Sequence, residues 1–185
     1  MKVLPVLASI LLAVATPATA NAEDFLKIFA LQMRLKQEGF YTGKIDGRFG
    51  AGSRAAMSAY AAKNNLPNKE TEIIDHMAIT AMRSRIEPTE GMREVAIAKV
   101  KEQLKDPFSA EISVDYAQMQ QGGAAVCGQV NAKNSYGAYT GNQAFQVTLT
   151  PSLLSSPPFF GIAQLEETGA AWLCLLGTST LSMVR

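Results

Sequence analysis

The sequence contains few of the side chains that usually carry out hydrolysis or bind a metal ion. Among 185 residues there are one histidine, His76, and two cysteines, Cys127 and Cys174. A zinc peptidase needs several histidine, aspartate or cysteine ligands, and a cysteine hydrolase needs a free thiol beside a histidine. A glycosidase needs two carboxylates flanking a sugar bond, whereas Glu111 and Asp115 fall on the predicted solvent face of a strand. We therefore expect a chain that is not an enzyme, with no catalytic residue, no metal site and no cofactor.

The chain has nearly equal numbers of positive and negative charges. The chain has 17 lysine and arginine residues and 16 aspartate and glutamate residues, and loss of a leader containing Lys2 would make the two numbers equal. A neutral chain offers no basic field for nucleic acid. The glycines between Gly47 and Gly52 precede a predicted helix, but they lack the lysine and the preceding strand of a phosphate-binding loop. We expect no nucleic acid as a partner.

The sequence also lacks an apolar run long enough to span a bilayer comfortably. Lys2 is followed by an apolar run over residues 3–14 and then by two Ala-x-Ala sites, at 18–20 and 20–22. This order is typical of a secretory signal peptide over residues 1–22, and an uncleaved anchor is the alternative. No cysteine directly follows the cleavage sites, so a lipoprotein anchor is not indicated. We expect a bacterial, periplasmic or secreted protein that leaves the membrane after signal cleavage.

Export affects how the two cysteines are interpreted. An even number of cysteines in an oxidising compartment favours one disulfide, between Cys127 and Cys174. Two buried free thiols are the alternative, because pairing cannot be proved from sequence. Both cysteines fall on apolar stretches predicted as strands, 125–130 and 171–176.

Residues 23–85 predict a small helical domain. Apolar residues recur at helical spacing in a stretch that ends at Gly39, and again over 53–63 and 71–83. Three short helices with a tight loop predict a three-helix bundle near the lower size limit for independent folding.

A loop rich in glycine joins the first two predicted helices. Three pairs in it place a glycine where the backbone must turn: Thr42-Gly43, Asp46-Gly47 and Phe49-Gly50. The loop and the flanking helices contain the motifs Leu31-Gln32-x-x-Leu35, Gly39-Phe40-Tyr41-x-Gly43-x-Ile45-Asp46-Gly47-x-Phe49-Gly50, Ser53-x-x-Ala56-Met57-x-x-Tyr60 and Asn65-Leu66-Pro67. In these motifs the segment over about 25–83 resembles the peptidoglycan-binding-like domain found beside many bacterial wall enzymes.

The resemblance implies the three-helix fold and peptidoglycan as the ligand. Two departures bear on the binding groove. Ala61 stands where the family usually has glutamine, and the segment after Pro67 lacks the family's second glycine turn.

The residues of the loop divide into two predicted roles. Residues expected to shape the turn or the core are Asp46, Gly47, Phe49 and Gly50, because an aspartate can accept bonds from its own turn and a glycine tolerates positive φ. Residues expected to face water and contact the ligand are Tyr41, Thr42, Arg48 and Arg54, since nothing in the local pattern requires their burial.

A polar break with proline and glycine, residues 86–91, predicts a linker to a second domain over 92–185. In that domain 92–104 has a helical pattern, whereas 112–116 and 145–150 alternate apolar and polar residues as strands with one wet face do. The overall fold class is therefore α+β, a three-helix bundle followed by a helix and a small antiparallel sheet.

The central strands are joined by residues 131–142, which mix amides, tyrosines and glycines. Such side chains suit a glycan or peptide ligand, and a long hairpin with glycine turns is the alternative. The motifs there are Lys105-Asp106-Pro107 and Val126-Cys127-Gly128-x-Val130-Asn131-Ala132-Lys133-Asn134-x-x-Gly137-x-Tyr139-x-Gly141. They resemble a recurrent, uncharacterised module of exported bacterial proteins.

The expected function is non-catalytic binding of cell-wall peptidoglycan by the N-terminal domain. A protein-interaction or structural module that keeps the bundle without glycan binding is the alternative, with another envelope protein as a partner of the C-terminal domain. A cell-wall hydrolase is less favoured, since the chain offers no catalytic set.

Overall fold

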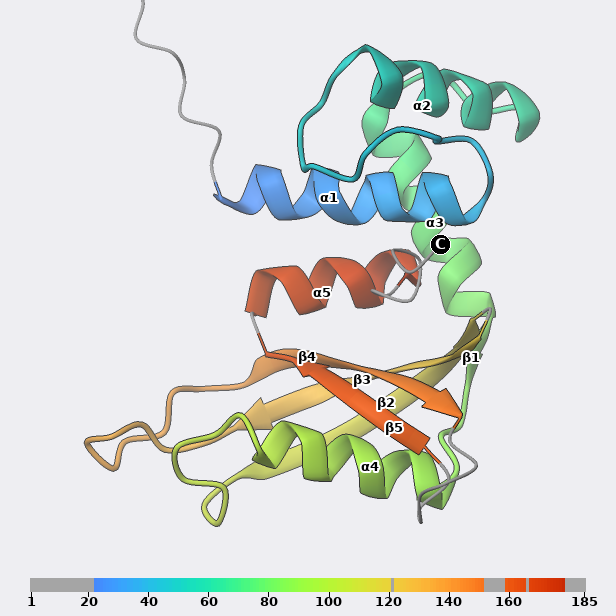
Figure 1. The fold of residues 1–185 in the computed structure, drawn as a ribbon. Coiled ribbons are helices and arrows are strands. Elements are labelled where there is room, and N and C mark those ends of the chain that lie inside the picture. The colour runs from blue at the N-terminus through green and yellow to red at the C-terminus, as the bar shows by residue number, and fades with distance from the viewer. Residues whose placement is uncertain (1–21, 121, 152–158, 166, 179–185) are drawn as a thin grey trace, which may run out of the picture.

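The computed structural model describes residues 22–120, 122–151, 159–165 and 167–178 (Figure 1). The signal peptide is expected over residues 1–22, of which 1–21 lie outside the described residues and Ala22 is the first residue of α1. The helices are α1 (Ala22–Gln37), α2 (Ala51–Lys63), α3 (Glu70–Arg83), α4 (Glu90–Lys101) and α5 (Glu167–Leu176). The strands are β1 (Arg85–Ile86), β2 (Glu111–Gln120), β3 (Gly123–Asn131), β4 (Gln143–Pro151) and β5 (Phe159–Gln164). The α+β class and the antiparallel sheet predicted from the sequence are confirmed.

Helices α1, α2 and α3 form because each has an apolar stripe at helical spacing that packs against the other two. Leu31 and Leu35 of α1, Tyr60 of α2, and Ile73 and Met77 of α3 are buried in one cluster. Among the helices within the described ranges, none is long and apolar enough to cross a membrane.

Within the described ranges the sheet has five strands in the order β1-β2-β3-β4-β5, and all neighbouring strands are antiparallel. Helix α4 covers one face, where its Val95 and Val100 pack with Val126, Phe145 and Val147 of the strands. Helix α5 lies on the opposite face, between the sheet and α1 (Figure 1). The predicted linker begins in the sheet, because Ile86 of β1 pairs with Ala117 of β2.

The sequence predicted a strand over 171–176, and this prediction is wrong. The stretch forms the last part of α5. Its alanine and three leucines favour a helix, and Gly177 follows with a φ of +62°, the left-handed conformation that commonly ends a helix. Leu173 and Leu176 are buried in the cluster that α1, α2 and α3 form. The core of the N-terminal helices therefore includes residues from the far end of the chain.

The predicted disulfide between Cys127 and Cys174 is present. It joins β3 to α5 rather than two strands. The bond therefore fixes α5 to the sheet.

The predicted wet face of residues 145–150 is covered by α5, so that prediction is wrong. Gln146 is 1% exposed and Thr148 is 5% exposed. The buried amides bind backbone carbonyls at the ends of helices: Gln146 Nε2 donates to Thr178 O (2.8 Å), and Gln118 Nε2 donates to Ala81 O (2.9 Å). Each buried amide nitrogen thereby has a backbone acceptor, one in the last turn of α3 and one just after α5.

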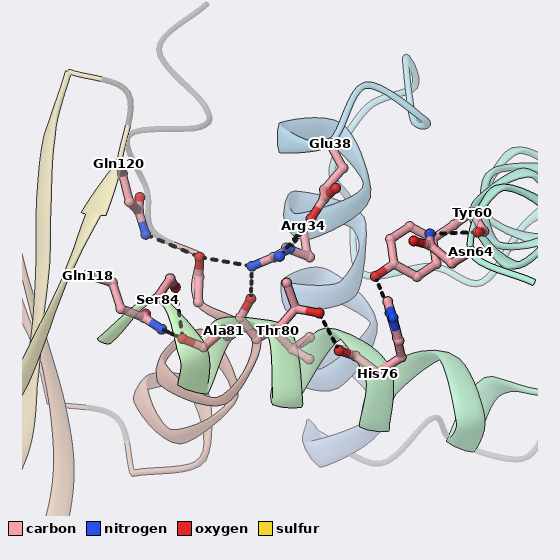
Figure 2. A network of polar contacts seen from close by, with 12 residues as sticks. Arg34, Glu38, Tyr60, Asn64, His76, Thr80, Ala81, Ser84, Gln118 and Gln120 are labelled. Atoms are coloured by element: carbon pink, nitrogen blue, oxygen red, sulfur yellow. Dashed lines mark hydrogen bonds and ion pairs between the residues drawn. The ribbon is translucent and has the colours of Figure 1, made fainter. Parts of the chain in front are cut away.

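Arg34 joins α1 to the end of α5 (Figure 2). Its side chain is buried, Nη1 donates to Leu176 O at 2.8 Å, and Nη2 pairs with Glu38 at 2.6 Å. The C-terminus of a helix carries a partial negative charge, so a cation placed there stabilises α5. Gln120 Nε2 donates to the neighbouring Gly177 O at 3.3 Å.

Candidate functional site

Gln32, in the middle of α1, holds the glycine-rich loop from inside. It is 1% exposed, and its Oε1 accepts bonds from Asp46 N (3.0 Å) and Gly47 N (2.9 Å). Its Nε2 lies 3.0 Å from both Asp46 Oδ1 and Arg48 O, and 3.1 Å from Ser53 Oγ. One amide therefore fixes the turn at 46–48 against the start of α2.

Asp46 and Gly47 have the structural roles predicted for them. Asp46 Oδ1 accepts from Arg48 N within its own turn (3.0 Å), and Gly47 has a φ of +66°. A Cβ at Gly47 would also collide with the ring of Phe25. Hydrogen bonds from Gln32 and from the Arg48 backbone favour the charged carboxylate, so they lower the pKa of Asp46.

Tyr41 does not face water, so this part of the prediction is wrong. The residue is 9% exposed, and its hydroxyl donates to Lys44 O at 2.8 Å. A Cβ at Gly43 would lie 2.7 Å from Tyr41 Cζ, so the ring fills the inside of the loop where only glycine fits. Tyr41 supports the loop and does not present a stacking face.

Thr42, Arg48 and Arg54 are exposed, as expected for ligand contacts. Arg54 Nη1 donates to Phe49 O at 3.1 Å, and its guanidinium lies 5.8 Å from the centre of the Phe49 ring. The structure thus brings Arg54 together with Phe49. Thr42 and Arg48 lie elsewhere on the loop and do not line the groove that Arg54 and Phe49 share.

A groove of about 320 Å³, here called the Phe49 groove, opens between the loop, α2 and the start of α3. It is lined by Phe49, Arg54, Met57, Ser58, Asn68 and Glu70. Its volume lies at the low end of the range of small-molecule sites. Phe49 was expected in the core, and it does pack against the core cluster, but it is only partly buried and also forms a wall of the groove.

The polar atoms of the Phe49 groove are held in place by their neighbours. Asn68 Nδ2 donates to Ser58 Oγ at 2.8 Å, and Glu70 pairs with Lys27 Nζ at 2.8 Å. The hydrogen bond that Lys27 donates to Glu70 raises the pKa of Lys27. An aromatic ring, a guanidinium and a hydroxyl–amide pair line one groove, which suits a polar ligand with a carboxylate and an apolar face.

The single histidine and the two cysteines are engaged in contacts within the protein. His76 Nδ1 lies 2.9 Å from Tyr60 OH (Figure 2). Both cysteines are joined in the disulfide. In the part of the chain that the structure describes, no group of three or more His, Cys, Asp or Glu side chains is arranged to hold a metal ion.

Neither the role of Gln32 nor the contribution of α3 to the groove is predicted from the sequence. The sequence does contain a sign that Gln32 has a role. It lies next to Leu31 on the apolar side of a predicted helix, where a polar side chain is unusual unless it forms buried hydrogen bonds. No such signal marks Asn68 or Glu70, since their approach to Phe49 depends on how α3 packs against α2.

Comparison with known proteins places this site within a recognised domain. Residues 27–75 match the family described as "Putative peptidoglycan binding domain". Two proteins of Bacillus cereus, both named "Spore cortex-lytic enzyme", are 48% identical to this chain over 48 residues. That similarity covers 26% of this chain and 17% of each relative, so the chain matches only about a sixth of their length. No solved structure matches the chain. Every residue of the Phe49 groove therefore lies within the segment, residues 27–75, that matches the "Putative peptidoglycan binding domain" family.

Proposed function

We propose that this chain is an exported, non-catalytic protein that binds cell-wall peptidoglycan at the Phe49 groove. The observation that carries the proposal is the family match over residues 27–75, which encloses the whole groove. The sequence pattern of a signal peptide supports a periplasmic or secreted location.

The chemistry of the groove is compatible with this polymer. Peptidoglycan presents carboxylates on its stem peptides and apolar faces on its sugar rings. Arg54 can bind a carboxylate, Phe49 can stack on a sugar ring, and Ser58 and Asn68 can bind hydroxyl and amide groups. Lys27 neutralises Glu70 at the edge of the groove, which reduces repulsion of an anionic ligand.

Replacement of Arg54 by alanine tests the site. An exposed arginine–carboxylate contact is worth about 1 kcal/mol or less, so binding to purified sacculi should weaken by up to about fivefold. Arg83→Ala removes an exposed arginine at the end of α3, outside the groove, and should bind like the parent. Co-sedimentation with sacculi over a range of protein concentrations gives both affinities. If Arg54→Ala and Arg83→Ala bind equally well, the groove is not the site.

The lytic activity named in the Bacillus cereus relatives makes a hydrolase the second candidate. The 48 shared residues are a small part of those proteins. Incubation of the protein with sacculi should release no soluble muropeptides, as judged by chromatography against a known muramidase. Release that grows with time would contradict the non-catalytic proposal. A folded protein that neither releases muropeptides nor co-sediments would instead be a protein-interaction module.

A further inference from the structure

The β3–β4 connection and the segment after α4 lie at the same end of the sheet (Figure 1). Residues of both segments line a second cavity, of about 210 Å³. We call it the hairpin pocket. Leu104, Val130 and Ala132 supply apolar walls, and Lys105 and Lys133 supply cations. It shares no residue with the Phe49 groove.

The hairpin that forms this pocket is ordered by its own hydrogen bonds. Asn134 Oδ1 accepts from Tyr136 N (2.9 Å) and Ala138 N (3.2 Å), and Asn131 Oδ1 accepts from Gly141 N (3.1 Å). Gly137 adopts a φ of +80°, which the tight turn requires. A binding surface fixed in advance loses little entropy when a ligand binds.

Contacts with the segment before β2 fix the hairpin further. Tyr139 OH donates to Ser109 O at 3.2 Å, and Lys133 N donates to Ser109 Oγ at 3.3 Å. These bonds keep Tyr136 and Phe108, which are 94% and 98% exposed, on neighbouring loops. Two large aromatic side chains that pack on nothing are available to a partner.

The two lysines of the pocket have no acidic partner among the described residues. Lys105 Nζ donates to Ser135 Oγ at 3.1 Å, and Lys133 Nζ lies 5.3 Å from the centre of the Tyr139 ring. Asp106, next to Lys105, accepts a bond from Ser109 N instead. Both ammonium groups are therefore available to an external carboxylate.

We propose that the hairpin pocket is a second binding site for the wall polymer, which takes a carboxylate of the polymer between Lys105 and Lys133 while Tyr136 stacks on a neighbouring sugar or peptide group. The inference rests on the proposed function for the identity of the polymer. Two sites on one chain that bind the same polymer give an avidity that neither has alone. The carboxylate belongs either to a stem peptide or to the glycan strand itself.

The test replaces both lysines by glutamine and measures co-sedimentation with sacculi. Two exposed charge contacts of about 1 kcal/mol or less each predict a loss of up to roughly thirtyfold. Lys63→Gln with Lys101→Gln, two exposed lysines outside the pocket, is the matched control and should bind like the parent. Far-UV circular dichroism checks that each variant is folded.

Amine labelling gives a second readout that does not depend on variants. An acylating reagent followed by mass spectrometry should label Lys105 and Lys133 less when the disaccharide-tetrapeptide is present, whereas Lys63 should be labelled equally. Protection by free stem tetrapeptide but not by peptide-free glycan strands would assign the carboxylate to the peptide, and the reverse would assign it to the strand.

The two proposals fail in different ways. A folded parent that does not co-sediment with sacculi contradicts the proposed function. A parent that co-sediments through Arg54, but equally well without Lys105 and Lys133 and with no protection of either lysine, contradicts only this inference. In that case the pocket belongs to a different partner, such as another envelope protein.

Discussion

At the scale of single residues, Gln32 determines the shape of the loop. Gln32→Ala would leave the part-buried Asp46 N–H and the buried Gly47 N–H without their acceptor, which should lower the free energy of unfolding by about 2–3 kcal/mol. Gln37→Ala changes an exposed glutamine on the same helix and should have little effect. Urea unfolding followed by circular dichroism measures both. Equal midpoints for the two variants would mean that the loop does not depend on this amide.

Asp46 links the loop to pH. Its pKa is lowered in the folded protein by the bonds from Gln32 and Arg48, so the carboxylate adds stability above its unfolded pKa, near 3.9. This stability is lost as the pH falls through the lower, folded pKa. Asp46→Asn should therefore lose less stability than the parent between pH 5 and pH 2. Parallel curves of urea midpoint against pH for the two proteins would argue against this role of the carboxylate.

The sequence predicts the turn residues of the loop better than the directions of its side chains. Asp46 and Gly47 are recognisable because a turn with positive φ favours a particular chemistry. Tyr41 was assigned to the wrong side because an irregular loop has no period from which facing can be inferred. The residue that fills the loop depends on tertiary contacts with Gly43 and Gln32.

At the scale of elements, α5 and its disulfide connect the two parts of the chain. The bond joins two cysteines that are 47 positions apart in the sequence. For a loop of this length the chain-entropy model gives a stabilisation of the folded state of about 4 kcal/mol. Reductant should therefore lower the unfolding midpoint of the parent. A variant with both cysteines replaced by alanine should start from the lower midpoint and should not respond to reductant. A parent whose midpoint is unchanged by reductant would show that α5 stays in place without the bond.

The same helix shows why short apolar runs are ambiguous. Residues 171–176 are apolar throughout, and such a run has no period that separates a buried strand from a buried helix. The alternating pattern at 145–150 correctly predicted a strand, but it could not show that α5 covers the polar face. Gln146 is buried by α5, a helix that lies elsewhere in the sequence. The apolar–polar alternation within the strand carries no information about that helix.

At the scale of the whole molecule, the N-terminal helices and the sheet share α5. The two-domain division at 86–91 remains a prediction from the sequence. A boundary there would separate α1 from Leu173 and Leu176, which pack in the core of the N-terminal helices.

Leu176→Ala should lower the free energy of unfolding by about 2–5 kcal/mol, because the side chain is fully buried among helices from the start of the chain. Met82→Ala, at an exposed position on α3, is the control. Circular dichroism and the fluorescence of Trp172 should report one coincident transition; separate transitions would show that the two halves unfold independently.

The most direct test of peptidoglycan binding is a residue-resolved titration of the whole chain with the soluble disaccharide-tetrapeptide. We predict that backbone amide resonances shift in a saturable way at residues 49, 54, 57, 58, 68 and 70, which line the Phe49 groove. Arg54→Ala should weaken these shifts, whereas Arg83→Ala should not. A folded protein whose groove resonances stay unchanged at millimolar ligand would contradict the account.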